Sequence, residues 1–92
     1  MRVFKYQLEV TDRQTVIMPK AARILCVQAQ NGRPCLWALV PDDMAPELRV
    51  IFTHGTGHTC SSDIGSYVGT YQLQNGAFVG HVFEETHRYD DV

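Results

Sequence analysis

Gln28-Ala29-Gln30-Asn31-Gly32 recurs with one change as Gln72-Leu73-Gln74-Asn75-Gly76, and both stretches stand between runs of alternating apolar residues. Asn and Gly accept a positive φ at low cost, so an Asn-Gly pair suits a two-residue type I′ turn. The twist of that turn matches the twist of the strands on either side. The sequence therefore predicts two antiparallel hairpins, one around each Asn-Gly pair.

The rest of the chain also shows the two-residue period of strands, and no segment has the 3.6-residue period of an amphipathic helix. The predicted strands are residues 3–10, 15–18, 22–30, 34–40, 48–53, 67–73 and 77–84. Pro19 ends the second strand because proline has no N–H to donate. Residues 35–40 are apolar on both faces, which predicts a central strand that is covered on both sides. We therefore expect an all-β fold, a small antiparallel β-sandwich or barrel of about seven strands.

The composition fits one small domain in a reducing compartment. The chain has 92 residues and a formal net charge of −2, and its eight Lys and Arg are scattered along the sequence. Its three cysteines are an odd number, and the N-terminal residues have no apolar stretch of the signal-peptide kind. We predict one β domain at residues 1–84, a flexible tail at 85–92, and a cytoplasmic location. Duplex nucleic acid and membranes are not expected as partners.

The richest candidate for a site lies in the aperiodic segment 54–66, which begins with His54-Gly55-Thr56-Gly57-His58. The two glycines would let successive backbone N–H groups turn toward one anion, and the threonine and histidines would add donors. The segment has no Walker lysine and no helix follows it, so it is not a P-loop. We treat these five residues as candidate ligand-binding residues. The alternative is a solvated connection whose glycines and hydroxyls serve tight turns.

Two other hypotheses for this segment have less support. His54, His58, Cys60 and Asp63 could supply four zinc ligands, but the paired Cys-x-x-Cys and His-Glu-x-x-His spacings are absent. Cys60 could be a nucleophile activated by a nearby histidine, but the members of such a triad usually come from distant parts of a chain. We therefore predict no catalytic residue, no metal and no cofactor.

Trp37 is the only tryptophan, and it alternates out of phase with Leu36 and Ala38. It either packs in a core layer, which we favour, or lies exposed as a marker of an interface. Gln28 and Gln72 stand at equivalent places before the two turns. We treat Trp37, Gln28 and Gln72 as candidate interface residues. We expect His81 to be a hydrogen-bonded histidine of the core or of an interface.

Segments spread over nearly the whole chain also carry a resemblance. They include Phe4-Lys5-Tyr6, Asn31-Gly32, Cys35-Leu36-Trp37-Ala38, Gly55-Thr56-Gly57-His58 and His81-Val82-Phe83. In this order they resemble a family of small uncharacterised proteins of tailed bacteriophages and prophages, a domain of unknown function. The chain departs from the family after His58, where relatives tend to carry a proline and an acidic, aliphatic stretch. The resemblance implies a setting, an infected bacterium, without implying a reaction.

In that setting we expect a non-catalytic accessory protein that acts by binding in the cytoplasm of the bacterial host. Its partner would be a host protein, such as a factor of antiviral defence, or a small anionic nucleotide signal that a homo-oligomer sequesters. The alternative is a minor virion or assembly protein with no ligand. A small hydrolase or metal-binding protein that uses residues 54–63 is the least supported class.

Overall fold

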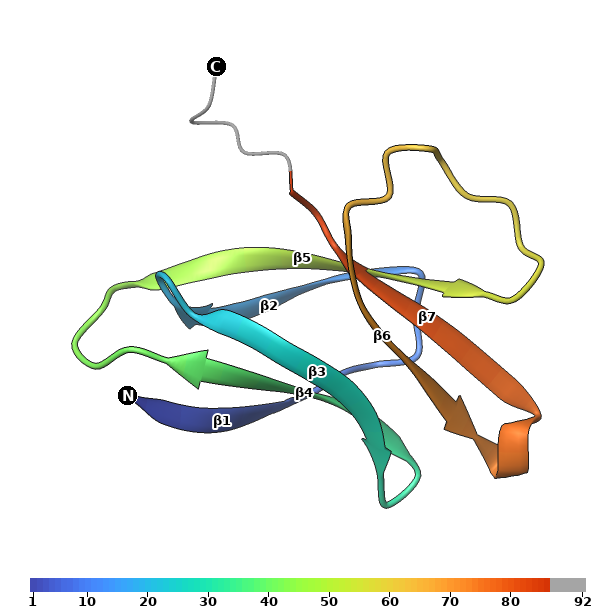
Figure 1. The fold of residues 1–92 in the computed structure, drawn as a ribbon, viewed down its shortest axis with the longest axis horizontal. Helices are drawn as coiled ribbons and strands as arrows, with labels where there is room; N and C mark the ends of the chain where they lie inside the picture. Colours follow the sequence, from blue (N-terminus) through green and yellow to red (C-terminus); the bar gives the residue numbers. More distant parts are fainter. Residues whose placement is uncertain (87–92) are drawn as a thin grey trace.

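The structure is a computed structural model, and it describes residues 1–86 of the chain. Seven strands form two antiparallel sheets (Figure 1), which confirms the all-β prediction. The strands are β1 (Arg2–Gln7), β2 (Arg13–Pro19), β3 (Arg23–Gln30), β4 (Arg33–Val40), β5 (Pro46–Gly55), β6 (Ser66–Leu73) and β7 (Phe78–Glu84). A single turn of 3₁₀ helix, η1 (Gln74–Gly76), lies between β6 and β7.

One sheet has the strand order β1-β4-β3 and the other has the order β2-β5-β7-β6. The two sheets approach each other closely where β3 passes β6 (Figure 1), because Gly69 of β6 has no side chain. A Cβ atom at Gly69 would lie only 2.9 Å from Val27 Cγ1 of β3. The two strands are not hydrogen-bonded neighbours. The fold is therefore a sandwich, and the barrel alternative is wrong.

Both Asn-Gly pairs form turns, but only the first gives a two-residue loop. Gln30 pairs directly with Arg33, and Asn31 and Gly32 between them have φ values of 53° and 75°. In the second hairpin, Leu73 pairs with Phe78, so the loop has four residues. The Ala77 N–H donates to Gln74 O at 3.1 Å across Asn75 and Gly76, whose φ values of 57° and 88° are also positive.

Alternation along the strands places the core between the two sheets. Leu36 and Ala38 of β4, Ile51 of β5 and Val82 of β7 are all fully buried. The other buried members of the two core clusters are Leu8, Met18, Ala22, Val27, Val40 and Tyr71, and Cys35 is buried outside these clusters. The strand β4 is central in its sheet, as predicted.

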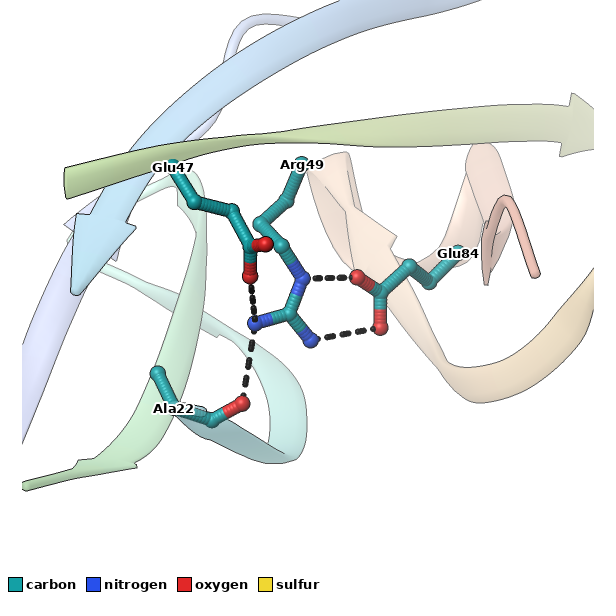
Figure 2. Close-up of polar contacts among 4 residues, drawn as sticks. All are labelled: Ala22, Glu47, Arg49 and Glu84. Atoms are coloured by element: carbon teal, nitrogen blue, oxygen red, sulfur yellow. Dashed lines mark hydrogen bonds and ion pairs between the residues drawn. The ribbon is translucent and has the colours of Figure 1, made fainter. Parts of the chain in front are cut away.

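A buried arginine ties the two sheets together at one end (Figure 2). The guanidinium of Arg49 in β5 donates to both carboxylate oxygens of Glu84, with 3.0 Å between Nη2 and Oε1. Its Nη1 donates to Ala22 O at 2.9 Å and lies 3.8 Å from Glu47 Oε2. Because Ala22 immediately precedes β3, the arginine joins the end of one sheet to the other sheet. The sequence did not single out this residue.

We predicted a tail at residues 85–92. Residues 87–92 of it lie outside the described residues. Glu85 still continues the sheet, since its N–H donates to Val50 O at 2.9 Å.

Candidate functional site

The predicted ligand loop begins inside a strand and ends in a tight turn. His54 and Gly55 are the last two residues of β5, and the connection that follows them extends beyond the sheet (Figure 1). The His58 N–H donates to Gly55 O at 3.1 Å, and Gly57 has a φ of 82° within this turn. This geometry matches the alternative interpretation, in which the glycines serve a tight turn.

The two histidines of this segment lie on opposite sides of the sheet. The His54 ring stacks on Phe52 at a centroid distance of 6.4 Å and meets the Phe83 ring edge-on at 5.9 Å, on the outward face. The His58 ring lies over Gly55, where an added Cβ would be 2.6 Å from His58 Cε1. That side of the strand is the side of the buried Thr53. The predicted anion cradle therefore does not gather both imidazoles.

Two small open cavities border His58. One has a volume of about 100 Å³ and lies beside Asp12 and Thr53, and the other, of about 190 Å³, lies beside Thr56 and Phe78. Both are smaller than the roughly 300–1,000 Å³ of typical small-molecule sites. Asp12 would also repel an anion in the first of them. The ligand role of residues 54–58 thus stays a prediction.

The structure instead links Thr56 to His81, a pairing that the sequence did not reveal. Thr56 Oγ1 lies 2.7 Å from His81 Nε2, and Thr70 Oγ1 lies 3.0 Å from His81 Nδ1. Tyr67 extends this chain of hydrogen bonds, with its hydroxyl 2.6 Å from Thr70 Oγ1. His54 and His81 are directly opposite each other on β5 and β7. We call these residues and the Phe52 and Phe83 rings the histidine cluster.

The histidine cluster lacks the parts of a hydrolytic or metal centre. Both nitrogens of His81 are occupied by hydroxyl groups, and no carboxylate orients the ring through them. Within residues 1–86, no three His, Cys, Asp or Glu side chains come together in a group that could hold a metal ion. His54 Nε2 is buried and has no hydrogen-bond partner in the same range. Cys60 lies exposed in the long connection.

Trp37 lies on the outward side of the three-stranded sheet. It pairs directly with Lys5 of β1 and Cys26 of β3, while its neighbours Leu36 and Ala38 point into the core. Trp37 is half-buried and belongs to neither cluster of core residues. The predicted core position of Trp37 is therefore wrong, although every residue of this strand from 35 to 40 is buried or half-buried, including Cys35 on the same outward side. No layer formed by residues 1–86 covers its outward face.

We call the outward side of β1, β4 and β3 the Trp37 face. Apolar side chains surround the tryptophan, among them Val3, which is 56% exposed, and Leu25, which is 44% exposed. The polar rim includes Gln28, opposite Cys35, and Lys5, whose Nζ donates to Gln30 Oε1 at 2.7 Å. The Trp37 face consists of Val3, Lys5, Gln7, Arg23, Leu25, Cys26, Gln28, Gln30, Arg33, Cys35, Trp37 and Leu39.

Gln72 does not belong to the Trp37 face, because it lies on β6 of the other sheet, opposite Val79. The three predicted interface residues therefore divide between two surfaces. Trp37 and Gln28 share one face, and Gln72 is exposed on the other sheet.

An open cavity of about 440 Å³ lies where β1 and β4 meet the loop after β4. Arg2 and Asp42 both line it, and Arg2 Nε is 3.9 Å from Asp42 Oδ1. The same carboxylate accepts a hydrogen bond from the N-terminal amine of Met1 at 3.2 Å. Arg2 and Asp42 are thus paired, and Asp43, which also lines the cavity, adds a negative charge that does not suit an anionic ligand.

The comparisons with known proteins describe a family without an assigned function. A family profile described as a domain of unknown function, DUF7352, matches residues 1–91. No curated protein and no solved structure matches the chain. Within residues 1–86, no helix is long and apolar enough to cross a membrane.

Proposed function

This chain belongs to the DUF7352 family of domains of unknown function, and from that premise we propose that it is a non-catalytic protein that binds a protein partner through the Trp37 face. In this proposal the partner is a host protein, such as a factor of antiviral defence, in the cytoplasm of a phage-infected bacterium. The resemblance described above supports the phage setting, and the exposed apolar residues of the Trp37 face support the choice of surface.

One observation carries the proposal: a half-buried tryptophan stands at the centre of a sheet face that no layer of residues 1–86 covers. Exposed Val3 and Leu25 extend this apolar surface, and glutamine and cationic side chains border it. Protein interfaces have this arrangement, with an aromatic anchor inside a polar rim. By contrast, both ring nitrogens of His81 in the histidine cluster already lie within hydrogen-bond distance of Thr56 and Thr70.

The test is affinity purification from phage-infected cells with the wild-type chain and two variants. Trp37→Ala should lose the co-purified protein, and binding of the isolated partner should weaken by at least about tenfold, as at a hot spot. Tyr67→Ala is the matched control because Tyr67 is 61% exposed on the other sheet. Circular dichroism and a thermal melt would verify that both variants fold. Retention of the same partner by Trp37→Ala would overturn the proposal.

A second candidate function is sequestration of a small anionic nucleotide by a homo-oligomer. The observation that favours it is the position of Arg13, an exposed cation on β2 directly opposite Phe52 of the histidine cluster. A second copy would have to cover this open face to enclose a ligand.

Thermal shift against a panel of nucleotides would test this candidate. A specific nucleotide at 100 times its dissociation constant should add about 2.7 kcal/mol to the free energy of unfolding. His81→Ala should abolish that shift, whereas His58→Ala should retain it, since His58 lies on the other side of the sheet. Light scattering that shows a monomer, or the lack of any shift, would count against sequestration.

A further inference from the structure

We infer that the partner of the Trp37 face is an acidic, extended peptide segment that adds a strand to the outer edge of β1. This inference rests on the proposed binding function and specifies the chemistry of the partner. Its support comes from the edge of the sheet, the distribution of charge, and the place of Trp37 beside that edge.

β1 has an edge that can accept a further strand. It is the outermost strand in the order β1-β4-β3, so one of its edges pairs with no strand of residues 1–86. Five of its six residues are exposed, and it contains no proline. Such an edge presents backbone N–H and C=O groups that an extended peptide can pair with. The outer strands of the other sheet are less suited, because β2 ends in Pro19 and β6 packs against β3.

The charge of this sheet selects an acidic partner. Its three strands contain four cationic residues, Arg2, Lys5, Arg23 and Arg33, and no Asp or Glu, although the whole chain has a net charge of −2. Lys5, Arg23 and Arg33 are exposed on the Trp37 face. Lys5 lies on β1 itself, and Arg23 and Arg33 add to the positive potential of the face, so this potential would attract the carboxylates of an added strand and repel a basic segment. Arg2 lies at the end of the strand beside Asp42, whose carboxylate offsets its charge.

Trp37 gives the added strand an apolar anchor. It lies one strand in from the edge, directly opposite Lys5. Neighbouring strands are about 4.8 Å apart, so a long apolar side chain of the added strand can reach the indole past Val3 or Lys5. We therefore expect acidic residues to alternate with apolar ones in the segment that binds.

The same cations could attract a single-stranded nucleic acid, but the structure favours a peptide. Only a peptide backbone satisfies the N–H and C=O groups of the β1 edge. Bases would need several aromatic rings to stack on, and Trp37 is the only aromatic side chain on this face. Val3, Leu25 and Leu39 instead provide apolar contacts for side chains.

The experiment uses the whole chain and the emission of Trp37, which is the only tryptophan and therefore reports this face directly. The probe is a short peptide that alternates glutamate with valine and phenylalanine. It is compared with the same peptide carrying lysine for glutamate, with the acidic peptide N-methylated along one edge, and with oligothymidylate. The acidic peptide should change the emission saturably, and added salt should weaken its binding. N-methylation should weaken it by at least about tenfold, because it removes several backbone hydrogen bonds.

The double variant Lys5→Glu with Arg23→Glu should weaken binding of the acidic peptide by at least about tenfold. The milder pair Lys5→Gln with Arg23→Gln should give an intermediate loss, which keeps the test open if charge reversal disturbs folding. Thr15→Glu, at an exposed residue of β2 in the other sheet, is the control for added negative charge and should leave binding within about twofold.

Three results would overturn the inference: no binding of the acidic peptide up to about 1 mM, equal binding of the lysine peptide, or full binding of the N-methylated peptide. Tighter binding of oligothymidylate would assign the face to nucleic acid instead. A protein that co-purifies through Trp37 but tolerates Lys5→Glu with Arg23→Glu would refute only this inference. A protein that co-purifies independently of Trp37 would refute the proposed function itself.

Discussion

At the scale of single residues, Arg49 shows how a charged side chain can belong to the interior. Its side chain is 7% exposed, and its donors meet the Glu84 carboxylate and the Ala22 carbonyl. Removing a charge from water costs several kcal/mol, and close paired contacts offset that cost. The arrangement therefore depends on both partners, and losing only one of them leaves a buried charge without its counterion.

We expect Arg49→Met to lower the free energy of unfolding by about 3–5 kcal/mol, because Glu84 then stays buried without a partner. Urea denaturation followed by circular dichroism would measure the change. The double variant Arg49→Met with Glu84→Met should recover much of the loss, since apolar side chains then replace the whole pair. A loss below about 1 kcal/mol for Arg49→Met would mean that the pair behaves like an exposed one.

The buried side chain of Tyr71 ends in a hydroxyl group that makes no hydrogen bond within the described residues. The residue is 2% exposed, and its hydroxyl has no hydrogen-bond partner within residues 1–86. We expect Tyr71→Phe to raise the free energy of unfolding by about 1 kcal/mol, because it removes a buried unsatisfied group. A clear loss of stability in a urea titration would show that the hydroxyl is satisfied in solution.

Burial of Tyr71 also makes the stability of the fold fall as pH rises in the alkaline range. Burial raises the pKa of Tyr71 above its ordinary value of 10.0, so the folded state keeps a proton that the unfolded state releases. This contribution to stability is complete below pH 10 and is lost as pH rises through the folded pKa. The pKa of Tyr6 is raised in the same way, so Tyr71→Phe should reduce the alkaline loss without abolishing it. Unchanged alkaline melting in Tyr71→Phe would contradict this account.

At the scale of elements, the contact between β3 and β6 depends on the absence of a side chain. A Cβ at Gly69 would lie 2.9 Å from Val27 Cγ1, whereas the backbone atoms of Val27 are 3.5 Å or more away. We expect Gly69→Ala to cost about 1–3 kcal/mol through overpacking. Adding Val27→Ala should cost less in the Gly69→Ala background than alone, and a double-mutant cycle would measure that coupling. Strict additivity would show that the two strands do not press on each other.

The sequence predicted those elements whose signals are local. Alternation located the strands, and Asn31-Gly32 gave the two-residue turn. The second loop is longer because Gln74 also adopts a positive φ of 53°, which its residue type does not signal. Alternation also separated Trp37 from Leu36, but it could not show which sheet faces have a layer against them.

The sequence could not predict contacts between strands that are distant in the chain, because alternation does not show which strands are neighbours. The pairing of His54 with His81 depends on β7 lying between β5 and β6. No local pattern in either strand encodes that neighbourhood. The separation of His54 from His58 follows once β5 is seen to extend to Gly55, because alternate residues then face opposite sides.

At the scale of the whole molecule, charge is divided between the sheets. The cations of β1, β3 and β4 have no carboxylates among them, whereas Glu47 and Glu84 lie on strands of the other sheet. The environment of Trp37 should therefore be positive even though the chain carries a net charge of −2.

We expect iodide to quench the emission of Trp37 more efficiently than caesium does, because the cationic surroundings attract anions. Added sodium chloride should reduce the difference by screening. The urea-unfolded chain is the control, since unfolding disperses the charges gathered by the sheet. Equal quenching by the two ions in the folded protein would contradict a positive Trp37 face.

The place of β7 has a consequence for the order in which the molecule can be built during synthesis. The sheet β1-β4-β3 needs no residue beyond Val40, so all of its strands are available early to the growing chain. β5 and β6 have no shared edge, and both must wait for β7 to be made before it can fill the space between them. A ribosome paused before Phe78 would thus hold a chain with one sheet able to form and the other interrupted. Chaperones and proteases can bind the unpaired strand edges of this incomplete chain.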